Sequence, residues 1–97
     1  MTVQEHLLSC LVEECAEISH RACKALRFGI DDTDPTIPGA PTERLMIWQE
    51  LNDLFAVVEL LREQEILPLG CDWTAIRAKK DKVKKFMDYA RERGALV

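Results

Sequence analysis

Apolar residues recur at three- and four-residue spacing through three long segments, and this periodicity constrains the fold more than any other feature. In the first segment the recurring residues are Leu7, Leu8, Leu11, Val12, Cys15, Ile18, Ala22 and Leu26. The second has Ile47, Leu51, Leu54, Val58 and Leu61, widened by Met46, Val57 and Leu60, and the third has Trp73, Ile76, Val83, Phe86, Met87 and Ala90. No segment shows the two-residue alternation of a strand, so the sequence predicts an all-α fold.

The residues that flank each periodic segment predict where the helices begin and end. Thr2 with Glu5 matches a capping box, and Gly29 is a typical stop after a helix. The expected helices run from about Val3 to Arg27, from Thr42 to near Ile66, and from just after Asp72 to near Arg93. Between the first two, "GIDDTDPTIPGAP" at 29–41 is rich in proline, glycine and aspartate, which predicts a surface loop.

A chain of 97 residues corresponds to one domain, 1–97, and three long helices joined by loops predict an antiparallel bundle. A domain of this size has a modest core. Because 47% of the residues are apolar, more than such a core needs, we expect a second subunit to complete the bundle. The expected assembly is a homodimer or a homotetramer.

Charge and hydropathy exclude several classes of partner. A net charge of −4 and a pI near 5.1 argue against a general nucleic-acid binder, which needs a basic surface. The longest wholly apolar run, "LFAVV", is far too short to cross a membrane, and the N-terminus lacks the features of a signal peptide. We therefore expect a soluble, cytoplasmic protein.

The four cysteines show no C-x-x-C spacing, which disfavours a zinc site. Cys15 and Cys23 lie on the apolar face of the first helical segment and are expected to be buried thiols.

The first helical segment carries an unusual group of acids, Glu13, Glu14 and Glu17, with no lysine between residues 1 and 23. Residues three and four apart share one face of a helix. The row through these acids reads Leu7, Cys10, Glu14, Glu17, Arg21, and it borders the apolar stripe instead of opposing it. Taken alone, such a group of glutamates is more often a solvated helix face than a site.

The second segment carries a matching pair, Glu50 and Asp53, in the row Met46, Glu50, Asp53, Val57, Leu60. If the two helices pack antiparallel, the acid pairs can meet. Four carboxylates in one small volume would raise one another's pKa, and a divalent cation would remove that conflict. A ligand set made only of oxygen atoms favours a hard ion, Mg²⁺ or Mn²⁺. The two groups together therefore predict a metal site.

These two boxes, Glu13-Glu14-Cys15-Ala16-Glu17 and Glu50-Leu51-Asn52-Asp53, resemble those of the all-α nucleoside triphosphate pyrophosphohydrolases. The C-terminal stretch "AKKDKVKKFMDYARERGALV" is similar to small phage-type members of the MazG-like group. One departure is the separation of Glu17 from Glu50 by 32 residues, which exceeds the usual gap in that family. The extra length falls in the 29–41 loop, where insertions cost little entropy.

The resemblance implies Mg²⁺-dependent hydrolysis of a nucleoside or deoxynucleoside triphosphate between the α- and β-phosphates, releasing a monophosphate and pyrophosphate. It implies that the metal ligands are Glu14, Glu17, Glu50 and Asp53. The catalytic candidates are Glu13 and Glu17. Glu13 would be a further metal ligand, an acid beside the ligands or a helper for the attacking water. The candidate substrate-binding residues are Lys79, Lys80, Lys82, Asn52 and Trp48. Packing in the core is the simpler role for Trp48 and for Phe28.

Two other interpretations remain open from the sequence. Glu17 and His20 form a Glu-x-x-His motif, which is typical of ferritin-like di-iron proteins, although such a site needs further ligands from other helices. A helical interaction module without enzymatic activity is the second alternative, and its stability would not respond to Mg²⁺.

Overall fold

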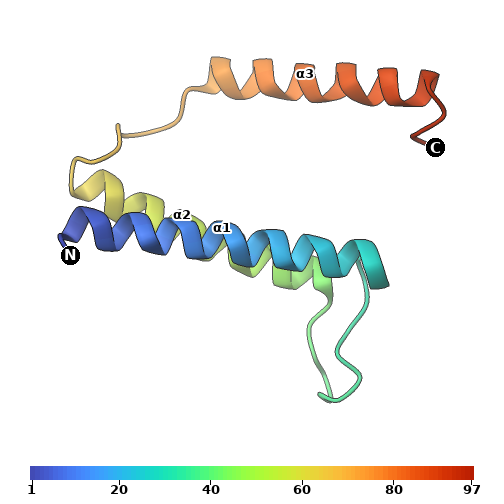
Figure 1. Ribbon diagram of the computed structural model, residues 1–97, viewed down its shortest axis with the longest axis horizontal. Coiled ribbons are helices and arrows are strands. Elements are labelled where there is room, and N and C mark those ends of the chain that lie inside the picture. Colours follow the sequence, from blue (N-terminus) through green and yellow to red (C-terminus); the bar gives the residue numbers. More distant parts are fainter.

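The computed structural model describes residues 1–97 and contains three α-helices and no strand (Figure 1). The helices are α1 (Val3–Phe28), α2 (Glu43–Glu63) and α3 (Trp73–Glu92), which confirms the predicted all-α class and all three helix starts. α2 ends three residues before the predicted Ile66, because the backbone at Glu65 turns into the left-handed region with φ of 58°. None of the three helices is both long enough and apolar enough to cross a membrane.

Side-chain caps define the beginning of each helix. At α1 the Thr2 hydroxyl accepts a hydrogen bond from the backbone N–H of Glu5 (3.1 Å), and the Glu5 carboxylate accepts one from the N–H of Thr2 (2.8 Å). Thr42 and Asp72 each accept a bond from the third residue of the helix that follows. These caps satisfy N–H groups that have no partner inside the helix, so the same residues that mark the helix starts in the sequence also stabilise them.

α1 and α2 pack side by side and run in opposite directions, whereas α3 packs against neither of them (Figure 1). In this antiparallel arrangement the second half of α1 lies beside the beginning of α2. The segment after α2 carries the chain away, so that α3 lies apart from the helix pair (Figure 1). A three-helix bundle is therefore not formed within one chain, and its completion by another subunit stays a prediction.

The loop between α1 and α2 is closed at its base. The backbone N–H of Arg44 donates to the carbonyl of Ile30 (2.8 Å), and the N–H of Glu43 donates to the carbonyl of Asp32 (3.0 Å). The guanidinium of Arg44 also pairs with the Asp31 carboxylate at 3.0 Å, and this ion pair lowers the pKa of Asp31. The start of the loop is thereby held against the first turn of α2, at the end of the helix pair from which the loop projects (Figure 1).

The chain buries few side chains by itself. Its exposed surface is 7,934 Å², against ~5,700 Å² expected for a compact protein of this mass. The radius of gyration is 17.1 Å, against about 13 Å for a compact domain of similar length. Leu61 is the one fully buried apolar side chain. Cys15 and Cys23, predicted to be buried, are exposed because they lie on parts of α1 that α2 does not cover.

Replacing Leu61 tests the packing of α2. We expect Leu61→Ala to lower the free energy of unfolding by about 2–5 kcal/mol, because a fully buried side chain leaves a cavity when it is truncated. The measurement is chemical denaturation followed by circular dichroism. The control is Leu69→Ala, whose side chain is 85% exposed and should change the free energy by at most about 0.5 kcal/mol. Equal losses in the two variants would contradict the burial of Leu61.

Candidate metal centre

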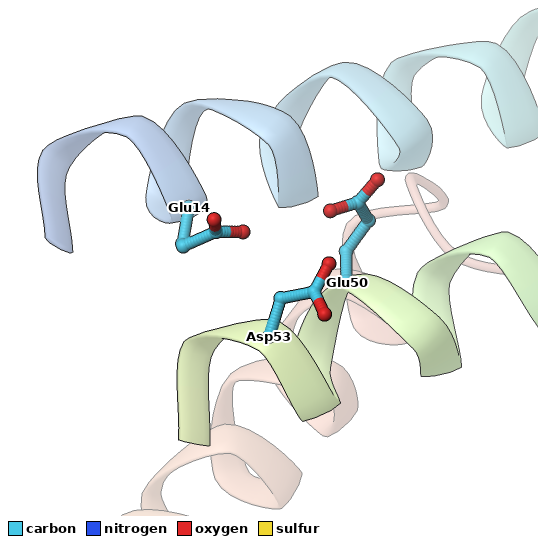
Figure 2. A group of neighbouring side chains, drawn as sticks. All are labelled: Glu14, Glu50 and Asp53. Atoms are coloured by element: carbon cyan, nitrogen blue, oxygen red, sulfur yellow. The ribbon is translucent and has the colours of Figure 1, made fainter. Parts of the chain in front are cut away.

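Three carboxylates from two helices meet between α1 and α2. Glu14 comes from α1, and Glu50 and Asp53 come from successive turns of α2 (Figure 2). One oxygen from each carboxylate lies within 4.8 Å of the others. The geometry follows from the sequence, because residues three apart share a helix face and the antiparallel packing turns the two faces toward each other. The predicted meeting of the two acid boxes is confirmed for these three side chains.

Glu14 is in the least favourable position of the three for a negative charge. Its Oε2 atom is buried and has no hydrogen-bond partner. Burial raises the pKa of Glu14, and the negative charges of Asp53, Glu50, Glu13 and Glu17 raise it further, in that order. Glu50 is half-buried and Asp53 is exposed, so the cluster opens to solvent on the Asp53 side.

The protein supplies no positive charge to the three carboxylates. The salt bridges of the chain join Arg21 to Glu43, Arg44 to Asp31 and Arg91 to Asp88, and none of them involves Glu14, Glu50 or Asp53. Ligand oxygens around Mg²⁺ lie about 2.0–2.1 Å from the ion, so those on opposite sides are about 4.2 Å apart. A small inward movement of the side chains would suffice, and both the spacing and the donor set therefore fit a hard divalent cation.

Glu13 and Glu17 stand outside this group of three. Both are exposed on α1, and Glu17 lies one turn beyond Glu14 on the same side of the helix. Their charges still act on the cluster, since each raises the pKa of Glu14. Of the four predicted metal ligands, the structure brings together Glu14, Glu50 and Asp53 and leaves Glu17 at the edge.

The predicted substrate-binding residues are spread over two parts of the molecule. Lys79, Lys80 and Lys82 are exposed on α3, which does not pack against the helices that carry the acids. Asn52 is exposed on α2, outside the carboxylate group. The core role predicted for Trp48 and Phe28 is wrong within the chain, since their side chains are 60% and 61% exposed. Both residues are therefore mostly exposed to solvent.

Sequence reasoning missed one polar pair in the same helix interface. Arg21 Nη1 lies 3.8 Å from Glu43 Oε1, and the Glu43 residue is only 8% exposed. A signal for this pair was present: Arg21 ends the row that contains Glu14 and Glu17, and Glu43 precedes Glu50 by two helical turns. The pair borders a cavity of about 370 Å³.

A comparison with protein-family models, curated protein sequences and solved structures finds no match to this chain. The relationship to the nucleoside triphosphate pyrophosphohydrolases therefore rests on the two acid boxes and their geometry. It stays a prediction.

The raised pKa of Glu14 predicts how stability depends on pH in metal-free protein. Folding disfavours the ionised carboxylate, so the penalty is absent below the ordinary pKa of 4.5 and is fully present above the raised value. Glu14→Gln should therefore unfold at a higher temperature than the unmodified chain at neutral pH in EDTA. The advantage should disappear as the pH falls below 4.5.

The matched control is Glu59→Gln, which removes an exposed acid on α2 outside the cluster. It should leave the pH profile of the melting temperature unchanged. A Glu14→Gln variant that is less stable than the unmodified chain at neutral pH without metal would show that the carboxylates do not repel.

Proposed function

We propose that this chain is a Mg²⁺-dependent pyrophosphohydrolase that cleaves a nucleoside or deoxynucleoside triphosphate between the α- and β-phosphates. The observation that carries the proposal is the convergence of Glu14, Glu50 and Asp53 without any cationic partner. Such a cluster repels itself at neutral pH, which is the expected state of a site built to bind a metal ion. The spacing of the acids within each of the two boxes, which resembles that of the pyrophosphohydrolases, supplies the reaction type.

The three clustered carboxylates would hold the metal. Glu14 offers a buried oxygen that has no other partner, and Glu50 and Asp53 offer oxygens from the facing helix. A bound Mg²⁺ or Mn²⁺ would neutralise the triphosphate, polarise its phosphoryl oxygens and activate water. The open Asp53 side is where the phosphates would approach, because the buried side of the cluster is closed by the helix pair.

Glu17 and Glu13 are proposed as the residues that act on the attacking water. Glu17 lies one turn along α1 from Glu14, is exposed, and has no salt bridge, so its carboxylate is free to accept a hydrogen bond and then a proton from water. Glu13 is also exposed and is the neighbour of Glu14 in sequence. It contributes negative charge that strengthens metal binding at Glu14.

The substrate phosphates also need positive charge, and α3 carries it in Lys79, Lys80 and Lys82. Within one chain these lysines do not reach the acids, because α3 lies apart from α1 and α2. We propose that the working form is a homo-oligomer in which α3 packs on another copy. The chain leaves about 2,200 Å² more surface exposed than a compact protein of its mass, an area within the range of obligate interfaces.

The exposed apolar face of α3 also favours a second candidate function, that of a helical interaction module. Trp73 and Phe86 on this helix are 72% and 60% exposed. The di-iron alternative has less support, since Glu17 and His20 are both exposed and neither belongs to the carboxylate cluster. A response of the melting temperature to Mg²⁺ separates the enzyme from the interaction module.

Two variants separate metal binding from catalysis. Asp53→Asn should abolish both the rise in melting temperature on adding Mg²⁺ and the release of pyrophosphate from a mixture of nucleoside triphosphates. Glu17→Gln should abolish pyrophosphate release and keep the Mg²⁺-dependent rise, because Glu17 lies outside the three clustered ligands. If Mg²⁺ is added at one hundred times its Kd, its binding should raise the free energy of unfolding of the folded chain by about 2.7 kcal/mol.

The control for both variants is Glu59→Gln, which should retain both responses. Pyrophosphate release at the unmodified rate by either Asp53→Asn or Glu17→Gln would contradict the proposed site.

The oligomer is tested by light scattering after size-exclusion chromatography. The unmodified chain should elute with a mass of at least two 11.1-kDa subunits. Phe86→Asp, which places a charge on the apolar face of α3, should shift it toward the monomer and lower pyrophosphate release. Lys85→Asp changes the charge on the polar side of the same helix and should keep the assembly. A monomeric unmodified chain would contradict this part of the proposal.

A further inference from the structure

We infer that the cavity between the second half of α1 and the 29–41 loop is the subsite for the nucleobase, with the Arg21–Glu43 pair recognising its hydrogen-bonding edge. This inference rests on the proposed function, since it assigns the base of the same nucleotide. The base that this subsite is expected to bind carries an exocyclic amino group next to a ring nitrogen or a carbonyl acceptor.

The cavity has a volume of about 370 Å³ and is bordered by α1, the loop and the start of α2. α1 contributes Arg21, Lys24 and Phe28, and the first turn of α2 contributes Glu43. The loop contributes acidic side chains, among them Asp34. The cavity is therefore lined by groups of both charges and one aromatic ring, which suits a polar, uncharged ring system better than a chain of phosphates.

The Arg21–Glu43 pair is incompletely bonded. Its closest approach is 3.8 Å, too long for a hydrogen bond. Arg21 Nε and Glu43 Oε2 are both buried, and neither has a hydrogen-bond partner. Buried donors and acceptors without partners are costly, so this pair is under-bonded in the free chain. Arg21 and Glu43 border the cavity, with 22% and 11% of their side-chain surface accessible. A ligand there that offers an acceptor to Arg21 and a donor to Glu43 would bond the accessible atoms of the pair.

The chemistry of the pair selects the ligand. A phosphate offers only acceptors and would face the Glu43 carboxylate, which repels it. Adenine, cytosine and guanine each place an amino donor beside an acceptor on one edge. The amino group would donate to the Glu43 carboxylate, and the acceptor would receive a hydrogen bond from the Arg21 guanidinium. Thymine and uracil carry a ring N–H between two carbonyl oxygens, so one oxygen would lie beside the Glu43 carboxylate.

Phe28 supplies a surface for the face of the base. Its ring borders the cavity and its side chain is 61% exposed, so it has room for a stacked partner. The Arg27 guanidinium lies 5.7 Å from the ring centroid. Aromatic side chains with a free face bind bases by stacking, with little dependence on which base it is. Stacking on Phe28 would therefore contribute affinity, and the Arg21–Glu43 pair would contribute selectivity.

The distance from the metal centre agrees with a nucleoside. Arg21 follows Glu14 by seven residues, and Glu43 precedes Glu50 by seven residues. Both intervals correspond to about 10 Å along a helix. The acid cluster and the Arg21–Glu43 pair thus lie two helical turns apart along the same α1–α2 interface, and Glu17 lies between them on α1. A nucleotide whose phosphates lie at the acids would place its base near Arg21 and Glu43.

The loop wall of the cavity is held in place before any ligand binds. Arg44 pairs with Asp31, and the backbone N–H of Glu43 donates to the carbonyl of Asp32 at 3.0 Å. Asp34 accepts hydrogen bonds from the hydroxyl and the backbone N–H of Thr36, at 2.7 and 2.9 Å. A preformed wall lowers the entropic cost of binding. The long loop between the two acid boxes therefore has a role, as one side of the base subsite.

The test measures binding of nucleoside monophosphates, which contain the base and the α-phosphate and are not substrates. In the presence of Mg²⁺, calorimetry should give the unmodified protein at least about tenfold tighter binding of dAMP, dCMP or dGMP than of dTMP. Glu43→Gln should reduce that preference to less than about twofold, because a neutral amide also offers a donor to the thymine carbonyl. The control Glu59→Gln should retain it.

A second variant keeps the inference testable if Glu43→Gln does not fold. Phe28→Ala, at an exposed position, should weaken all four monophosphates by about tenfold and leave the order of preference unchanged. Equal affinity of the unmodified protein for all four, no affinity for any, or an unchanged preference in folded Glu43→Gln would overturn the inference. Selective binding without pyrophosphate release from triphosphates would overturn the proposed function alone.

Discussion

Mutual repulsion among carboxylates between α1 and α2 is the constraint on which the rest of this structure depends. Packing the two helices forces Glu14 against Glu50 and Asp53, with one oxygen of Glu14 buried and without a partner. A chain selected only for stability would place apolar residues or an ion pair there. The interface instead maintains negative charge where a cation would offset it, and the exposed Glu17 lies one turn away. The same helix packing that stabilises the fold thus builds the candidate metal centre.

The second feature of the molecule is how much surface it leaves uncovered. α3 contributes nothing to the packing of α1 and α2, although it carries an exposed apolar face, interrupted by Lys80, and a group of lysines. The acidic and the basic halves of the proposed site therefore lie on parts of one chain that do not touch. Assembly of identical chains would bring the two halves together and bury the apolar face. In this account, metal binding belongs to the single chain and phosphate binding to the assembly.

The helix starts and the meeting of the acid boxes were predictable from the sequence, whereas the position of Glu17 and the placement of α3 were not. The caps at Thr2, Thr42 and Asp72 mark helix starts because they satisfy backbone groups nearby in the chain. The meeting of the acid boxes followed from helical periodicity and antiparallel packing. The outlying position of Glu17 depends on the rotation of α1 about its axis, which periodicity does not define. The Arg21–Glu43 pair lies two helical turns from the acid cluster in the same interface, so the same periodicity held a signal for it. The separation of α3 depends on how the segment after α2 folds, and composition alone does not specify that.

The central claim is that the carboxylate cluster serves hydrolysis between the α- and β-phosphates. The most direct measurement is phosphorus nuclear magnetic resonance of a mixture of nucleoside triphosphates incubated with the unmodified protein and Mg²⁺. The account predicts that nucleoside monophosphate and pyrophosphate appear in equal amounts, and that EDTA stops both. Formation of nucleoside diphosphate and inorganic phosphate, or unchanged triphosphates with every base, would contradict it.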